Sequence, residues 1–145
     1  MITDTITQKI GEALKAHDEI RLSTLRLLSS ALNYEFIAKQ HKLSEDEELV
    51  VVRREAKKRK EAIEAYEKAG YKDRAEKEAK ELAILQEYLP PEVSDDDIAK
   101  LVDEAMKETG ASAISDMGKV IGLVKQKTKG AADGAVIANL VRQKL

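Results

Sequence analysis

Cysteine and tryptophan are missing from this chain, and among its 145 residues there are only two prolines and one phenylalanine. Without cysteine the protein has no disulfide, no thiolate metal ligand and no cysteine nucleophile. Its apolar runs fall short of the roughly 18 residues that a membrane-spanning helix needs. The N-terminus carries Asp4 and no long apolar segment, so a secretory signal is not expected. We therefore expect a cytoplasmic protein with no membrane partner.

The sequence is rich in alanine, leucine, glutamate and lysine, and 36% of its residues are charged. This composition is typical of a helical protein. Apolar residues recur at helical spacing along the chain, and no segment alternates as a half-buried strand would. The sequence predicts an all-α fold.

Capping and stop signals set the expected helices. Asp18, Ser44, Ser94 and Ser115 are expected N-caps, and Ser44 with Glu47 forms a capping-box pattern. The helices are expected over residues 4–16, 18–41, 44–69, 72–88, 94–110, 115–129 and 133–144. Two of them have clear inner faces, formed by Leu25, Leu28, Leu32 and Phe36 and by Ala75, Ala79, Leu82, Leu85 and Leu89.

The strongest break in the chain is Pro90–Pro91, because proline ends a helix and disfavours helix at the residue before it. We expect residues 1–90 to form an N-terminal domain, an antiparallel array of long helices. Residues 94–145 are expected to form a small C-terminal three-helix domain.

The net charge of −2 hides a segregation of charge. Residues 94–116 carry two basic and seven acidic side chains, whereas residues 117–145 carry six basic and one acidic. Steering of a charged partner depends on where charges lie, so the last segment is a candidate surface for an anionic partner.

One basic feature is the segment 53–60, RREAKKRK, in which six of eight residues are positive. Most of these side chains fall on one arc of the expected helix, opposite its apolar seam. The arc has two interpretations: a solvated face balanced by Glu61 and Glu64, or a stripe that contacts phosphates. Its candidate contact residues are Arg53, Arg54, Lys57 and Lys58.

The other basic feature is the segment 116–134, DMGKVIGLVKQKTKGAADG. Gly118, Gly122, Lys125 and Lys129 line one side of the expected helix, away from its apolar face. The glycines either admit a neighbouring helix or let an external backbone approach, with lysines beside it to bind an anion. The nucleic-acid hypothesis adds Lys119, Lys127, Arg142 and Lys144 as contacts, with Gly130 and Gly134 shaping the turn.

We find no motif for catalysis, metal binding or a cofactor. Zinc-protease, nucleophile-elbow and phosphate-loop patterns are absent, and His17 and His41 lie alone among polar neighbours. The acidic runs are those expected at helix N-termini. The residues themselves therefore favour a binding protein over an enzyme.

Three stretches resemble the YqeY family: residues 25–37 (LRLLSSALNYEFI), residues 61–98 with their AG corner and YLPPEVSDDDI, and residues 116–145. That family is similar to the C-terminal tail domain of the tRNA-dependent amidotransferase. The tail shares a pattern represented here by Gly118, Thr128, Lys129 and Gly130.

The resemblance implies a tRNA-binding accessory module of translation, acting alone or with amidotransferase or aminoacyl-tRNA synthetase subunits. It also implies a family label of carbon–nitrogen ligase with glutamine as amido donor, although the resemblance is to a non-catalytic domain. The alternative is a helical adaptor that binds a protein through the Gly118 and Gly122 helix face. A third hypothesis is an enzyme that takes part in transamidation, and it needs a site that the residues do not supply.

Overall fold

A computed structural model describes residues 1–145 as seven α-helices and one short 3-10 turn, with no β-strand. The predicted all-α class is confirmed. The chain divides into two compact units, Met1–Leu89 and Pro90–Leu145, and each is described by itself. None of the helices has both the length and the apolar character needed to cross a membrane.

Short polar side chains begin most of the helices, as the sequence predicts. Asp18 accepts a hydrogen bond from the backbone of Arg21 at the start of α2 (Glu19–Lys39). Ser44 and Glu47 form the predicted capping box of α3 (Glu45–Lys68), with bonds of 3.2 and 3.0 Å. Ser94 caps α5 (Asp95–Thr109) in the predicted way. Each bond satisfies a backbone group that the first helical turn leaves unpaired.

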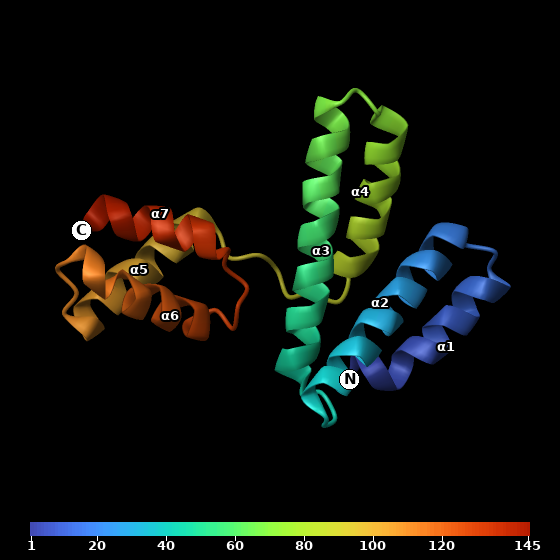
Figure 1. Ribbon diagram of the computed structural model, residues 1–145, viewed down its shortest axis with the longest axis horizontal. Helices are drawn as coiled ribbons and strands as arrows, with labels where there is room; N and C mark the ends of the chain where they lie inside the picture. Colours follow the sequence, from blue (N-terminus) through green and yellow to red (C-terminus); the bar gives the residue numbers. More distant parts are fainter. The chain divides into compact units, whose positions relative to one another are not determined.

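The first unit is made of two helical hairpins (Figure 1). One joins α1 (Ile2–Lys15) to α2, and the other joins α3 to α4 (Lys72–Gln86). Their shared core is apolar and contains Ile6, Leu28, Leu32, Leu43, Val51, Val52, Ala56 and Leu85. The buried Glu48 carboxylate accepts hydrogen bonds from the backbone N–H and the hydroxyl of Thr3, so it fixes the first turn of α1 to α3.

Two predictions about inner faces are wrong. Phe36 is 46% exposed, because it lines the open cavity described below instead of packing into the core with Leu28 and Leu32. Ala79 is exposed, whereas Glu81 of the same helix is only 6% exposed. Glu81 is buried because it pairs with a cation of α3. Nε of Arg59 lies 3.1 Å from Oε2 of Glu81 and 3.6 Å from Oε2 of Glu78.

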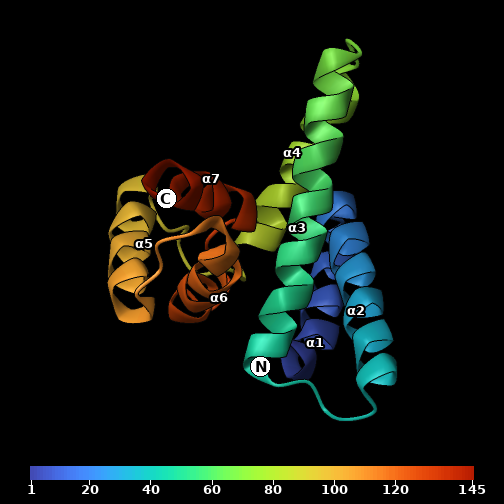
Figure 2. The same cartoon turned by 60° about the vertical axis from the view of Figure 1, so that its left-hand side comes forward.

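The second unit packs three helices around its own core: α5, α6 (Met117–Lys127) and α7 (Gly134–Lys144) (Figure 2). The predicted cap of α6 by Ser115 is wrong, because Ser115 lies inside the 3-10 turn η1 (Ile114–Asp116). Asp116 orders this turn by accepting hydrogen bonds from the backbone of Ser112 and Ala113. These bonds hold the pKa of Asp116 below its ordinary value.

Candidate nucleic-acid interface

Helix α6 separates its apolar and polar residues, as its spacing predicts. Val120 and Val124 are fully buried in the core of the second unit. Gly118, Gly122, Lys119 and Lys125 lie on the exposed side of the same helix. We call these four residues the glycine–lysine face. At about 100° per residue, Lys119 and Lys125 lie on either side of the two glycines.

Neither glycine of this face is explained by packing within the second unit. A β-carbon built on Gly118 or on Gly122 would meet no atom of another helix of this unit within 4 Å. No neighbouring helix of this unit therefore requires the close approach that a glycine permits. Both residues have ordinary helical backbone angles, so the turn geometry does not require them either.

Lys125 reaches from α6 to the first residue of α7. A β-carbon on Gly134 would lie 3.0 Å from Cε and 3.1 Å from Nζ of Lys125. Gly134 was predicted to shape the turn, but its φ is not positive, and its missing side chain instead leaves room for this lysine. Asp133, the residue before it, caps α7 through a 2.9 Å bond from the backbone of Ala135.

The turn after α6 places a lysine where glycine is the usual residue. Lys129 has a φ of 52° and the following Gly130 has a φ of 78°. The backbone N–H groups of these two residues bond to Gln126 and Lys125, which is the Schellman arrangement. Gly130 thus has the turn role that was predicted for it. A side chain in this left-handed region costs about 1 kcal/mol, so Lys129 is held at some expense of stability.

Three other predicted contact residues are engaged within the unit. Nζ of Lys127 lies 2.8 Å from Glu108 and 3.7 Å from Glu104, both on α5. The Glu108 carboxylate accepts a hydrogen bond from Lys127 and raises the pKa of this lysine. Lys144 forms an ion pair with Asp103, and Arg142 donates a hydrogen bond to Asn139. The acidic face of α5 therefore draws Lys127 and Lys144 away from the glycine–lysine face.

Much of the basic stripe of α3 is paired within the first unit. Arg54 lies 3.1 Å from Glu35 of α2, and Lys58 lies 3.2 Å from Glu55. Arg53 is half-buried, and burial lowers its pKa. Lys57 is exposed. Glu35 lies 19 residues before Arg54, on the preceding helix, so the local sequence of α3 gives no signal of this partner.

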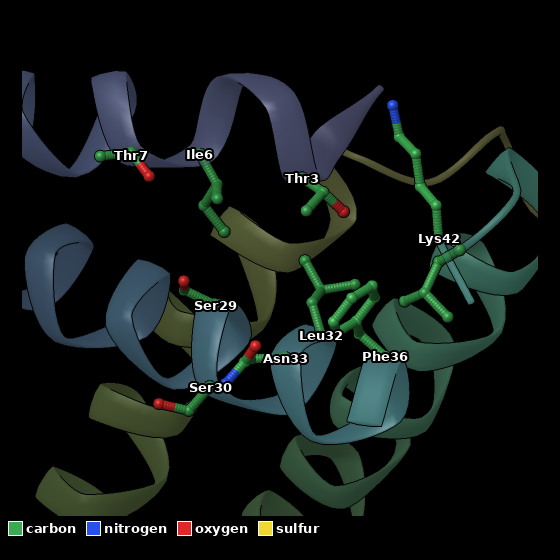
Figure 3. A pocket seen from close by; sticks show the side chains of 10 residues that line it. Thr3, Ile6, Thr7, Ser29, Ser30, Leu32, Asn33, Phe36 and Lys42 are labelled. Atoms are coloured by element: carbon green, nitrogen blue, oxygen red, sulfur yellow. The ribbon is translucent and has the colours of Figure 1, made fainter. Parts of the chain in front are cut away.

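The first unit also contains a cavity of about 420 Å³ between α1 and α2 (Figure 3). Thr3 and Ile6 of α1 face Leu32 and Phe36 of α2 across it, and Lys42 lies at one end. The lining includes hydroxyl groups and one amide but no carboxylate, and its other members are Thr7, Ser29, Ser30, Asn33 and Leu43. No group of three or more histidine, aspartate or glutamate side chains is placed to hold a metal ion.

Comparison with known proteins places these features in a family. The family model described as Yqey-like protein matches residues 3–145, which include both the stripe of α3 and the glycine–lysine face. An uncharacterized protein of Schizosaccharomyces pombe is 32% identical over 89 residues. That match covers 61% of this chain and 72% of the yeast protein.

Proposed function

The chain belongs to the Yqey-like protein family, and we propose that it is a tRNA-binding accessory module whose main contact is the glycine–lysine face. One observation carries this proposal. Gly118 and Gly122 are exposed with open space around them, between two exposed lysines. A glycine inside a helix costs about 1 kcal/mol relative to alanine, and nothing within the second unit accounts for that cost.

A sugar–phosphate backbone fits this surface in shape and charge. The two glycines remove side chains from the helix, so a backbone can lie close to it. Lys119 and Lys125 then supply the charge that phosphates attract. The end of Lys125 lies beside the first turn of α7, whose N–H groups favour an anion. We expect recognition of backbone and shape, since this face carries no aromatic ring for stacking on bases.

The resemblance of residues 116–145 to the amidotransferase tail supports tRNA as the partner. By this proposal the chain binds tRNA alone or beside amidotransferase or synthetase subunits, and other proteins supply the carbon–nitrogen ligase chemistry with glutamine as amido donor. Lys129 and Arg142 would extend the contact around the end of α6 and along α7. The paired Lys127 and Lys144, and the stripe of Arg53, Arg54, Lys57 and Lys58, would be secondary contacts.

The test compares two charge-reversed proteins by their binding to unfractionated tRNA. Lys119→Glu/Lys125→Glu alters the proposed face, whereas Lys100→Glu/Lys107→Glu makes the same change in net charge on α5 of the same unit. We expect the first to weaken binding roughly tenfold or more at about 100 mM salt, and the second far less. Equal losses would mean that net charge alone matters and would contradict the assignment of this face.

The second candidate function is a protein adaptor, because an open pair of glycines also suits a partner helix. Here the lysines would lie at the rim of the contact. Binding through helix packing should change little with salt, whereas binding to phosphates falls steeply. Capture of an amidotransferase or synthetase subunit from nuclease-treated extract, with no affinity for tRNA, would favour the adaptor.

A further inference from the structure

The corner between α3 and α4 lies at the outer end of their hairpin (Figure 1). Aromatic and cationic side chains gather at this corner. The Arg74 guanidinium lies 5.1 Å from the centre of the Tyr71 ring and 5.9 Å from that of Tyr66. The whole chain has only five phenylalanine and tyrosine rings, and two of them meet here. We call Tyr66, Tyr71 and Arg74 the corner cluster.

The backbone turn between the helices brings the members of this cluster together. Gly70, with a φ of 81°, ends α3 in a Schellman turn. The backbone N–H of Tyr71 bonds to the carbonyl of Tyr66 at 2.9 Å, which brings the two tyrosines together. Such a turn needs only an apolar contact between these positions, and aliphatic side chains would supply it. The aromatic pair with its guanidinium therefore exceeds what the turn requires.

The cluster is also open to a partner. Tyr71 is 55% exposed, and Arg74 is exposed as well. The buried residues of α3 end at Ala56, more than two turns before the corner, and Tyr66 is half-buried. Residues 66–74 carry three basic and two acidic side chains, so charge alone would attract an anion only weakly. Flat π-surfaces are the main feature that the corner presents.

We propose that the corner cluster stacks on an unpaired base of RNA, with Tyr71 as the stacking ring and Arg74 holding its orientation. This inference rests on the proposed function, because its partner is RNA, but it concerns the other unit of the chain. Every base has a π-face, so tyrosine and arginine planes bind bases with little regard to sequence. The exposed Lys72 is placed to meet a neighbouring phosphate.

The test uses the full chain with two probes, unfractionated tRNA and an unstructured oligoadenylate of about ten nucleotides. Tyr71→Ala should weaken oligoadenylate binding roughly 5- to 100-fold, whereas Tyr71→Phe should stay within about twofold, because the ring remains. The matched control is Tyr34→Ala, which removes an 81% exposed tyrosine of α2. It should leave binding unchanged. Circular dichroism of each variant should show the same helix content.

Unchanged oligoadenylate binding by Tyr71→Ala, or an equal loss from Tyr34→Ala, would overturn the inference. Salt dependence separates it from the proposed function. Tyr71→Ala removes no charge and should keep the salt slope, whereas loss of lysines on α6 should reduce that slope. If tRNA binding depends on Lys119 and Lys125 but Tyr71→Ala has no effect, base stacking at the corner cluster is refuted and the proposed function stands. Oligoadenylate binding through Tyr71, without tRNA binding through the lysines, refutes the proposed function alone.

Discussion

The two units use their basic side chains in different ways. In Met1–Leu89, several arginines bind acidic residues on or next to another helix, as Arg21 does with Glu87, Arg54 with Glu35 and Arg59 with Glu81. In Pro90–Leu145, α5 pairs with Lys127 and Lys144, while Lys119 and Lys125 stay beside two open glycines. A dense basic run in the sequence therefore does not tell which of its cations are held in ion pairs. Under the proposed function, binding depends on the charge left at the surface after the helices have packed.

Arg59 gives the largest expected effect, because it tests whether the basic residues of the first unit are structural. Arg59→Ala leaves Glu78 and the nearly buried Glu81 without their cation, which should lower the free energy of unfolding by roughly 3 kcal/mol. Arg54→Ala, which breaks a more exposed pair, should cost about 1 kcal/mol or less. Urea denaturation measures both. Equal and small losses would show that the ion pairs of Arg59 with Glu78 and Glu81 contribute no more to stability than a surface ion pair does.

Gly122 tests whether the glycine–lysine face of the second unit serves binding at the expense of stability. Gly122→Ala should raise the free energy of unfolding by up to about 1 kcal/mol, because the helix gains propensity and the new methyl group meets open space. The same substitution should weaken tRNA binding several-fold, since the methyl group keeps the RNA backbone away. Gly11→Ala in α1, also facing open space, is the matched control and should stabilise without affecting tRNA. If Gly122→Ala is more stable and still binds tRNA fully, the close approach of an RNA backbone does not explain why this position is glycine.

Lys129 allows a similar separation of stability from binding. His17 and Lys129 occupy the same position of a Schellman turn, with φ values of 55° and 52°. Glycine at either position should stabilise the chain by roughly 0.5–1 kcal/mol, because it removes the strain of a left-handed side chain. Only Lys129→Gly should also weaken tRNA binding. The measurements are thermal unfolding and tRNA titration, and a loss of binding in His17→Gly would contradict the comparison.

The smallest expected effect concerns pH. Burial is the main cause that raises the pKa of Glu81, so the folded chain holds a proton more tightly than the unfolded chain. The stability gained from neutral Glu81 is therefore complete below its unfolded pKa and lost as pH rises through the raised value. Glu81→Gln mimics the neutral acid and should match wild type near pH 4 but exceed it near pH 8. Denaturation at the two pH values checks this, and a constant difference would refute it.

The helices and most of their caps were predictable because they depend on local signals. Asp18, Ser44, Ser94 and Gly70 act within a few residues of their own position. The apolar face of α6 followed from its period, and so did the exposure of Gly118, Gly122 and Lys125. The expectation that Lys129 lies on the same side of the helix is wrong, because α6 ends at Lys127 and Lys129 lies in the left-handed turn after it.

The ion pairs between helices were not predictable because they join distant parts of the chain. Arg59 meets Glu81 across the hairpin, and Lys127 meets Glu108 across two helices. Ala79 was placed inside because it fits the apolar period of α4, yet Arg59 draws the neighbouring glutamates inward. Ser115 fits the pattern of a cap, but Asp116 organises a 3-10 turn there instead. Such choices are settled by tertiary contacts.

The most direct test of tRNA binding by the glycine–lysine face is the salt dependence of the affinity for tRNA. The association constant would be measured for the wild-type chain and for Lys119→Glu/Lys125→Glu from roughly 50 to 300 mM salt. We predict saturable binding, with an association constant whose logarithm falls steeply with the logarithm of salt concentration and a slope shallower by about 1 to 2 in the variant. A slope that is flat in the wild type, or identical in the two proteins, would contradict binding of tRNA phosphates at this face.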